Sequence, residues 1–385
     1  MNKVAVLGEH INMGMYCTRP TADLYRQTGL NTGNLAFIYA VLSHLQNEVT
    51  LLPWHASPEQ YEAVDIIVIP CANQLGKHTD LGRHAELLRK SGKPVVAIGL
   101  GAQAEVLGSD IELTEGTATW VETIRASCIN PGAPNIYTRG PYTSQQLDRL
   151  GFPGSLPGGC PSHFINPAPN LGHRIHAAWT SMPVPRSLSV AGGHHRWAKA
   201  RIIEQQLIAM MQDPRSFGQY VVQSEEDMVR LARNDFDLIE PATLELLRQY
   251  LCPHYAMDEF KTWSRMYARA FFDINAWMDS LREADLTIGP RYHGTALAIQ
   301  AEKMGVTIAV DSRTTELCME TGVPFLTAEE LATKPLTRHS IKQMIKFDPA
   351  AYDKHRLKKA KLYVDFLKSN KLVPSSYLEK LATST

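Results

Sequence analysis

The stretch that most constrains the fold of this chain runs from Ala284 to Asp311 and reads ADLTIGPRYHGTALAIQAEKMGVTIAVD. It begins with a short apolar run, Asp285–Gly289, which stops at a Gly-Pro pair and is typical of a buried strand. Small and aliphatic residues with helical spacing follow over Gly294–Met304, and we expect Gly305 to end this helix. A second apolar run then leads to the closing aspartate. The order strand, helix, strand predicts a βαβ unit of a parallel sheet.

Arg291, Tyr292 and His293 occupy the loop between the first strand and the helix of this unit. Ligands of parallel sheets bind at the carboxyl ends of the strands, where the next helix presents free N–H groups and a partial positive charge. An arginine and a histidine at that place suit an anionic ligand and a proton transfer. The alternative is a surface arginine followed by a capping or solvated histidine. The position of the pair in the expected binding loop favours the functional interpretation.

Chain length and charge limit the class of protein. A chain of 385 residues predicts two domains, each large enough to bury its own core. Lysine plus arginine and aspartate plus glutamate both number 39. Because no basic excess is available to neutralise phosphates, this balance argues against nucleic acid as the main partner. A local basic pocket remains compatible with it.

The cysteines and the apolar segments indicate the cellular compartment in which we expect the protein. The six cysteines are scattered without a C-x-x-C pair, so the sequence indicates neither a zinc site nor a disulfide scaffold. The N-terminal apolar run is too short for a signal peptide, and no run approaches the roughly 18 apolar residues of a membrane span. We therefore expect a cytoplasmic protein without a transmembrane span, either free or peripheral to the inner face of the membrane.

The first half of the chain shows the same alternation of strands and helices, beginning with a strand at Val4–Leu7. Residues 9–33 are polar and irregular, and they are long enough for a functional loop. Gly33 and Asn34 then open a helix over Leu35–Leu45, as a glycine turn with an asparagine cap. Both a binding mouth and a plain helix cap fit this pattern.

Two further strand ends of the first half carry candidate residues. Pro94–Ile98 has a strand pattern, and Gly101 follows it in a glycine-bearing turn that permits close approach of the backbone to a ligand. This turn lacks the third glycine and the adjoining helix of a dinucleotide-binding motif, so it does not predict an NAD site. Arg139 ends a strand at Asn135–Thr138, beside a helix that starts with proline. It either repeats the arrangement of Arg291 or is a surface arginine.

The second half begins after a segment rich in proline and glycine, residues 153–170, which predicts a hinge. Ser187–Ala191 is a strand pattern, and a helix pattern covers Ala198–Met211. The loop between them contains two glycines, two histidines and Arg196, which suit an anion or a polar acceptor; an exposed loop is the alternative. Arg313 follows the closing aspartate of the βαβ unit, at another strand end.

These motifs together resemble the polysaccharide pyruvyl transferase family. In that family a strand ending in glycine, an Arg-x-His, a small-residue helix and a second strand ending in aspartate recur. The resemblance is close over residues 284–312 and partial at 31–45, 94–103, 135–166 and 218–226. It implies a fold similar to that of GT-B glycosyltransferases, an α/β protein of two Rossmann-like domains that face a central cleft.

This fold implies a division of the chain. We expect an N-terminal Rossmann-like domain over residues 1–165 on the acceptor side and a C-terminal Rossmann-like domain over residues 166–345 on the donor side. The remaining residues, 346–385, are expected to form a helical tail that packs back on the first domain. An amphipathic, lysine-rich pattern over Ile341–Asn370 predicts a solvated helix face.

The resemblance also implies an activity. It is that of an enzyme that transfers the enolpyruvyl group of phosphoenolpyruvate to a saccharide of a polysaccharide or its precursor, forming a pyruvate ketal and releasing phosphate. No separate cofactor or metal is expected. The saccharide acceptor can be lipid-linked or nucleotide-linked, and the sequence leaves open whether the protein is a homo-oligomer. Two alternatives are a GT-B glycosyltransferase that uses a nucleotide-sugar donor and a non-catalytic glycan-binding protein of the same fold.

The family pattern assigns catalytic roles to Arg139, Arg291 and His293. The two arginines would hold the anionic groups of the donor, one from each domain, and the histidine would give and take protons. The dipole of the following helix would disfavour the protonated histidine until an anionic donor is bound. Substrate-binding roles are expected for residues next to these strand ends: Gly33, Asn34, Gly101, Arg196, Tyr292, Gly294 and Arg313.

Overall fold

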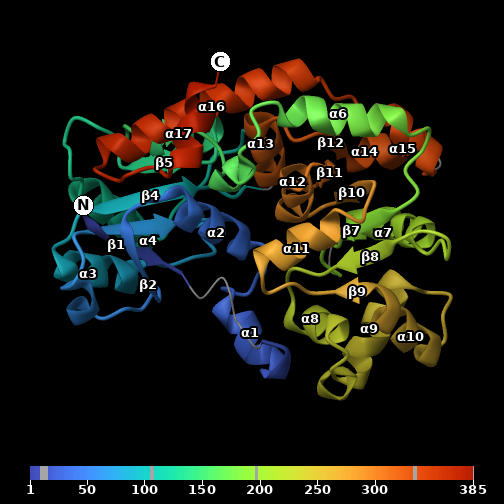
Figure 1. Cartoon of the computed structure of the whole chain (residues 1–385). Helices are drawn as coiled ribbons and strands as arrows, with labels where there is room; N and C mark the ends of the chain where they lie inside the picture. Colours follow the sequence, from blue (N-terminus) through green and yellow to red (C-terminus); the bar gives the residue numbers. More distant parts are fainter. Residues whose placement is uncertain (9–15, 105–107, 196–197, 333–335, 385) are drawn as a thin grey trace.

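The structure is a computed structural model of the chain, and it describes residues 1–8, 16–104, 108–195, 198–332 and 336–384. The chain forms two α/β halves, each built on a parallel sheet of six strands (Figure 1). The expected fold class, an α/β protein of two Rossmann-like domains, is confirmed by these two parallel sheets. Within the described residues, no helix is both long enough and apolar enough to cross a membrane.

The first sheet has the strand order β2-β1-β3-β4-β5-β6. Its inner strands are apolar and fully buried, as expected for a parallel sheet that is covered on both faces. The order along the sheet reverses between β1 and β3, so the loops that follow these strands flank a switch point, where ligands of such sheets bind. The strands are β1 (Lys3–Leu7), β2 (Glu48–Leu52), β3 (Ile66–Pro70), β4 (Val95–Leu100), β5 (Ile136–Thr138) and β6 (Leu156–Pro157).

The second sheet has the strand order β12-β11-β10-β7-β8-β9. Here the order reverses between β7 and β10, which pair in parallel with Thr287 opposite Ser189. The loop that contains Arg291 and His293 follows β10 and therefore begins at this second switch point. The strands are β7 (Leu188–Ala191), β8 (Gly218–Val221), β9 (Ala268–Arg269), β10 (Leu286–Gly289), β11 (Met304–Ala309) and β12 (Phe325–Thr327).

Helices connect the strands of both sheets (Figure 1). Those of the first half are α1 (Thr21–Gln27), α2 (Asn34–His44), α3 (Gly82–Ser91), α4 (Glu115–Ala126) and α5 (Pro141–Arg149). Those of the second half are α6 (Leu171–Ser181), α7 (Ala198–Met211), α8 (Glu226–Ala232), α9 (Pro241–Leu251), α10 (Met257–Tyr267), α11 (Ile274–Leu281), α12 (Tyr292–Gln300), α13 (Ser312–Thr321), α14 (Ala328–Ala332) and α15 (Arg338–Met344). The chain ends with α16 (Pro349–Ser369) and α17 (Ser376–Thr383).

The end of α12 differs from the sequence prediction. The helix ends at Gln300 and Gly305 lies inside β11, so the expectation that this glycine stops the helix is wrong. A Cβ atom at position 305 would lie 2.1 Å from the carbonyl oxygen of Thr295. The glycine therefore permits α12 to pack directly on its neighbouring strand, a close approach that the sequence pattern alone does not distinguish from a helix stop.

The segment 9–33 also departs from its prediction, because its described part contains the helix α1. Leu24 and Tyr25 of this helix are buried in the core of the second half, and the Tyr25 hydroxyl accepts a hydrogen bond from Glu225 N at 2.7 Å. A seven-residue helix has little stability of its own, so this packing stabilises it. Asn34 is not a helix cap: it is the first residue of α2, and its side chain donates to Thr28 O at 2.9 Å.

The C-terminal helix α16 joins the two halves. Tyr363 and Leu367 pack in one apolar cluster with β1, β3 and β4 of the first sheet, while Tyr352 packs in the core of the second half. Arg356, 0% exposed, donates hydrogen bonds to three carbonyl oxygens of the segment between the halves: His163, Asn166 and Ala168.

One lysine of α16 is not part of a solvated face. Lys359 forms an ion pair with Glu320 of α13, in which the two side chains are only 15% and 9% exposed. The prediction of a lysine face that is solvated throughout is therefore wrong at this position. Its partner belongs to the second half of the chain, so the sequence around α16 gave no sign of the pair.

Candidate active site

Residues at the carboxyl ends of strands from both sheets line one narrow cavity of about 50 Å³. Its described lining contains three arginines, a histidine and four side-chain amides, but no carboxylate. A concave site with fixed cations and no acid favours an anionic ligand. The first half contributes Asn31, Asn34, Ala72, Asn73 and Arg139, and the second half contributes Gln223, Pro290, Arg291, Tyr292, His293, Arg313, Thr314 and Leu317.

Arg139 follows β5 and is almost completely buried. Its Nε donates a hydrogen bond to Gly99 O at 3.0 Å, which is its one side-chain hydrogen bond within the described residues. The terminal nitrogens are thus left for a ligand. A Cβ atom on Gly101 would lie 2.7 Å from the Cδ atom of Arg139, so this glycine makes room for the arginine. Burial lowers the pKa of Arg139, and the nearby Arg313 lowers it further.

Arg291 is the residue that immediately precedes α12, and its backbone is extended there, with φ −103° and ψ 104°. Its Nη2 donates a hydrogen bond to the Ser224 hydroxyl. Burial lowers the pKa of Arg291 to about 10, and Arg313 contributes to this effect, while the Glu204 carboxylate opposes it. The guanidinium nevertheless remains charged at neutral pH, and water screens its field weakly at this depth.

His293 is the second residue of α12, and its Nε2 lies 3.6 Å from the sulfur of Cys160. Burial lowers the pKa of His293 to about 3, and Arg139 and Arg313 add to this effect. The imidazole is therefore neutral at physiological pH when no anion is bound. The direction agrees with our expectation, but burial and two cations cause the shift, where the sequence suggested the helix dipole.

The thiol of Cys160 contacts a histidine that is distant in the sequence, His293. The neighbouring His163 is buried elsewhere, with its ring centroid 5.4 Å from that of Tyr352. Burial raises the pKa of the Cys160 thiol, so it stays protonated, and its sulfur lies 3.1 Å from the Ser162 hydroxyl. The thiol is thus a neutral neighbour that helps to hold the imidazole of His293.

Two carboxylates lie near the arginines but do not line the cavity. Glu204 is fully buried and accepts hydrogen bonds from the hydroxyls of Tyr220 (2.7 Å) and Tyr250 (2.8 Å). Glu316 of α13 accepts hydrogen bonds from N and Oγ1 of Thr143, both at 2.8 Å. Because these acids are satisfied by hydrogen bonds within the protein, the cavity itself keeps its positive character.

A comparison with protein families matches the chain over most of its length. The family described as polysaccharide pyruvyl transferase matches residues 31–312, which include every described residue that lines the cavity except Arg313, Thr314 and Leu317.

The chain belongs to the polysaccharide pyruvyl transferase family.

Comparisons with individual proteins are more distant. None of the curated proteins matches the chain. Among solved structures, it is similar to MnaA of S. aureus with UDP (10% identity, TM-score 0.44, 97% of this chain and 99% of that one). It is also similar to the UDP-GlcNAc 2-epimerase of Neisseria meningitidis bound to UDP-GlcNAc (9% identity, TM-score 0.43, 96% and 100%) and to MurG of Acinetobacter baumannii (13% identity, TM-score 0.38, 96% and 99%).

The other residues predicted to bind substrate differ in where the structure places them. Arg313 lines the cavity and is paired with Asp311 at 3.0 Å. Tyr292 also lines it, but its hydroxyl donates to Thr321 Oγ1 at 3.1 Å, away from a ligand. Asn34 lines the cavity as well. Arg196 lies outside the described residues.

Two glycines of the family pattern act by making space. A Cβ atom on Gly33 would lie 2.7 Å from Gln223 Oε1 and 3.3 Å from His293 Nδ1. A Cβ atom on Gly294 would lie 2.8 Å from both Gln223 Nε2 and the Cβ of Ala191. Each glycine therefore permits other side chains to reach the site.

Several lining residues were missed in the sequence: Asn31, Asn73 and Gln223. Asn73 and Gln223 follow buried strands, β3 and β8, so a polar side chain just after an apolar run was the available signal. Asn31 precedes the turn that opens α2, and its Oδ1 accepts a hydrogen bond from Gly33 N at 2.9 Å. No sequence rule separates this from an ordinary turn.

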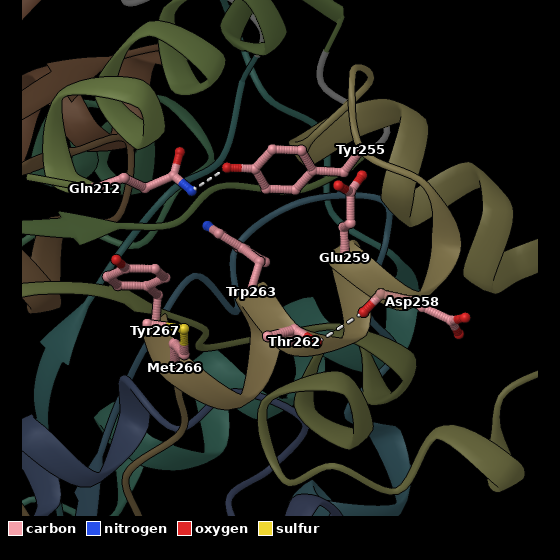
Figure 2. A pocket seen from close by; sticks show the side chains of 8 residues that line it. All are labelled: Gln212, Tyr255, Asp258, Glu259, Thr262, Trp263, Met266 and Tyr267. Atoms are coloured by element: carbon pink, nitrogen blue, oxygen red, sulfur yellow. Dashed lines mark hydrogen bonds between the residues drawn. The ribbon is translucent and has the colours of Figure 1, made fainter. Parts of the chain in front are cut away.

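A larger cavity, of about 510 Å³, lies in the second half near α10 (Figure 2). Gln212 donates a hydrogen bond to the Tyr255 hydroxyl at 2.7 Å, and the charged residues of the lining are Asp258 and Glu259. No arginine or lysine is among the described residues that line it. This cavity does not suit an anionic donor, and none of the predicted site residues lies there.

Proposed function

We propose that this member of the family transfers the enolpyruvyl group of phosphoenolpyruvate to two hydroxyls of a saccharide, forming a pyruvate ketal and releasing phosphate. The observation that carries this proposal is the cavity in which Arg139, Arg291 and Arg313 converge without a lining carboxylate. Phosphoenolpyruvate has one phosphate and one carboxylate, and charge-assisted hydrogen bonds from guanidinium groups are the strongest contacts that side chains offer to such anions. The acceptor is a lipid-linked or nucleotide-linked saccharide.

The reaction needs one proton delivered and two hydroxyl protons removed. A proton adds to the methylene carbon of the donor, and one saccharide hydroxyl oxygen bonds to the adjacent carbon and loses its proton. The bond between that carbon and the phosphate oxygen then breaks, and the second hydroxyl oxygen takes the place of phosphate. The two protons lost by the hydroxyls balance the one gained by the methyl group and the one carried by the released hydrogen phosphate.

His293 is the group proposed to deliver the first proton. Its pKa of about 3 in the free protein results from burial and from Arg139 and Arg313. A bound dianion next to these arginines neutralises their field and raises the pKa of the histidine. Donor binding therefore brings the imidazole into the range in which general acid catalysis is effective.

The test first compares the binding of possible donors and then compares saccharide acceptors. We expect phosphoenolpyruvate to raise the melting temperature of the protein, because a ligand that binds only the native state stabilises it, whereas UDP and GDP should not. Incubation with phosphoenolpyruvate and a panel of lipid-linked and nucleotide-linked saccharides should then release phosphate and add the mass of a pyruvate ketal. Stabilisation by UDP or GDP, and not by phosphoenolpyruvate, would replace the proposal with a glycosyltransferase. Glycan binding without phosphate release would indicate a non-catalytic protein.

A further inference from the structure

Gln223 is a buried residue that joins the two halves at the cavity. It follows β8, lines the cavity and is 2% exposed. Its carbonyl oxygen accepts a hydrogen bond at 2.8 Å from Thr32 N, in the turn that opens α2. The backbone of Gln223 is thus fixed by the first half of the chain, although the residue belongs to the second.

Two glycines, one from each half, create the space that the amide of Gln223 fills. Its Oε1 lies 2.7 Å from the place where a Cβ atom of Gly33 would be, and its Nε2 lies 2.8 Å from the corresponding place at Gly294. Any other residue at position 33 or 294 would push this amide out of position. The site is therefore built around a side-chain amide in one defined place.

The Nε2 group of this amide has no hydrogen-bond partner within the described residues. Leaving a buried donor unsatisfied is costly, and native proteins rarely do so without a reason. Because Gln223 lines a cavity that suits anions, an acceptor oxygen of a bound ligand would satisfy this N–H group.

The position of Gln223 indicates which oxygen that is. The next residue, Ser224, accepts a hydrogen bond from Arg291, so the amide and this guanidinium belong to the same part of the cavity. Arg139 and Arg313 are the two cations that act on His293. A dianionic phosphate suits the pair of cations, and a monoanionic carboxylate suits one cation and one neutral donor.

We propose that Nε2 of Gln223 donates a hydrogen bond to the carboxylate of the donor, beside Arg291, while Arg139 and Arg313 bind its phosphate. This inference rests on the proposed function and adds the residue that distinguishes phosphoenolpyruvate from phosphate alone. A hydrogen bond to a charged group corresponds to about a tenfold to hundredfold difference in affinity.

The experiment measures the affinities of the full-length protein for phosphoenolpyruvate and for inorganic phosphate by titration calorimetry. Gln223→Met and Gln223→Leu remove the donor while keeping an unbranched or similarly sized side chain. Gln300→Met is the matched control, because Gln300 is also a buried glutamine whose Nε2 has no partner in the described part of the chain, and it lies outside the cavity lining. We expect the ratio of the two affinities to fall at least tenfold in the Gln223 variants and to stay unchanged in Gln300→Met.

The ratio separates a binding role from a structural one, because a general distortion weakens both ligands together. An unchanged ratio in either Gln223 variant, or an equal fall in Gln300→Met, overturns the inference. Absence of binding of phosphoenolpyruvate to the wild-type protein overturns the proposed function itself, and binding to wild type with an unchanged ratio in the variants overturns the role of Gln223 alone. Two variants are used because one apolar side chain at a buried site can prevent folding.

Discussion

At the scale of single residues, the site works by holding an imidazole neutral until a ligand arrives. His293 is surrounded by protein and faces the fields of two arginines, and its pKa is about 3 in consequence. Such a group cannot serve as an acid at neutral pH unless binding changes its surroundings. The arginines that we propose to bind the anion thus control the protonation state of the histidine.

This coupling predicts proton uptake on donor binding. Because the pKa of His293 rises from about 3 when an anion binds, the bound protein holds more protons than the free protein, and lowering the pH from 7 to 5.5 should favour binding of phosphoenolpyruvate more in wild type than in His293→Gln. Calorimetric titrations in two buffers of different ionisation enthalpy should show that wild type takes up more protons than this variant, by a difference that approaches one proton at the acidic end of this range. The variant His293→Gln lacks the imidazole, so its titration measures the protons that the phosphate group of the ligand itself gains or loses on binding. Equal uptake by wild type and this variant would contradict the prediction.

Some residues of the site could be predicted from the sequence, because they directly follow a strand pattern. Arg139 and Arg291 each end a strand pattern, and carboxyl ends of parallel strands meet at one edge, so their presence in one cavity follows from topology. Gln223 also follows a strand, β8, but its position after the strand does not by itself give its role. Its importance depends on space left by Gly33 and Gly294, and nothing local in the sequence connects these three residues.

At the scale of elements, the helix α5 shows how the two halves are joined beside the site. The sequence places Arg139 at a strand end, beside the N-terminus of this helix. In the structure its N–H group at Thr143 is occupied by the carboxylate of Glu316, from α13 of the second half. The acid serves as a cap for a helix that is distant in sequence, and it stabilises the partial positive charge at that end.

Removing this cap should destabilise the protein. Glu316→Ala leaves Thr143 N without its buried partner, and the loss of such a bond costs about 1–3 kcal/mol. Urea unfolding should show this as a lower free energy of unfolding. Glu122→Ala is the control, because Glu122 is exposed and, within the described part of the chain, pairs only with Arg125 on its own helix; it should change the free energy by less than about 0.5 kcal/mol. Equal effects of the two substitutions would show that Glu316 does not support the contact between the halves.

Element boundaries were predictable where one pattern acts alone. The helix α7 begins at Ala198 and ends at Met211, as its apolar spacing predicts. The C-terminal end of α12 was not predictable. Gly305 has the same local sequence context as a helix stop, but it permits close packing of the helix on the strand. The helix α1 was missed because its stability comes from the core of the second half. Local sequence carries no record of such contacts.

At the scale of the whole molecule, the two halves are interlocked. The helix α1 of the first half packs in the second core, and α16, at the end of the chain, packs against the first sheet. Arg356 of α16 also holds the segment that connects the halves through its hydrogen bonds to His163 O and Ala168 O. The cavity therefore lies between two bodies that are tied by helices at both ends of the chain.

Histidines buried throughout this assembly make its stability depend on pH. Burial lowers the pKa of His44 and His293 to about 3, that of His84 to about 4, and that of His163 well below its ordinary value. In the unfolded chain each titrates near 6.5, so below this pH the unfolded state binds more protons than the native state. The free energy of unfolding therefore falls as the pH decreases, by up to about 1.4 kcal/mol per pH unit for each such histidine.

We expect the urea midpoint to drop clearly between pH 6.5 and pH 5.5, a range in which carboxylates of ordinary pKa remain ionised. His44 offers the sharpest check, because its ring is enclosed by aromatic side chains, with the centroid of Tyr363 at 5.4 Å, so that a phenyl ring can replace it. His44→Phe should show a shallower dependence on pH, by about one proton, whatever its effect on stability at pH 7.5. A dependence as steep as that of wild type would mean that His44 takes up no proton on unfolding, and that the acid sensitivity of this fold has another source.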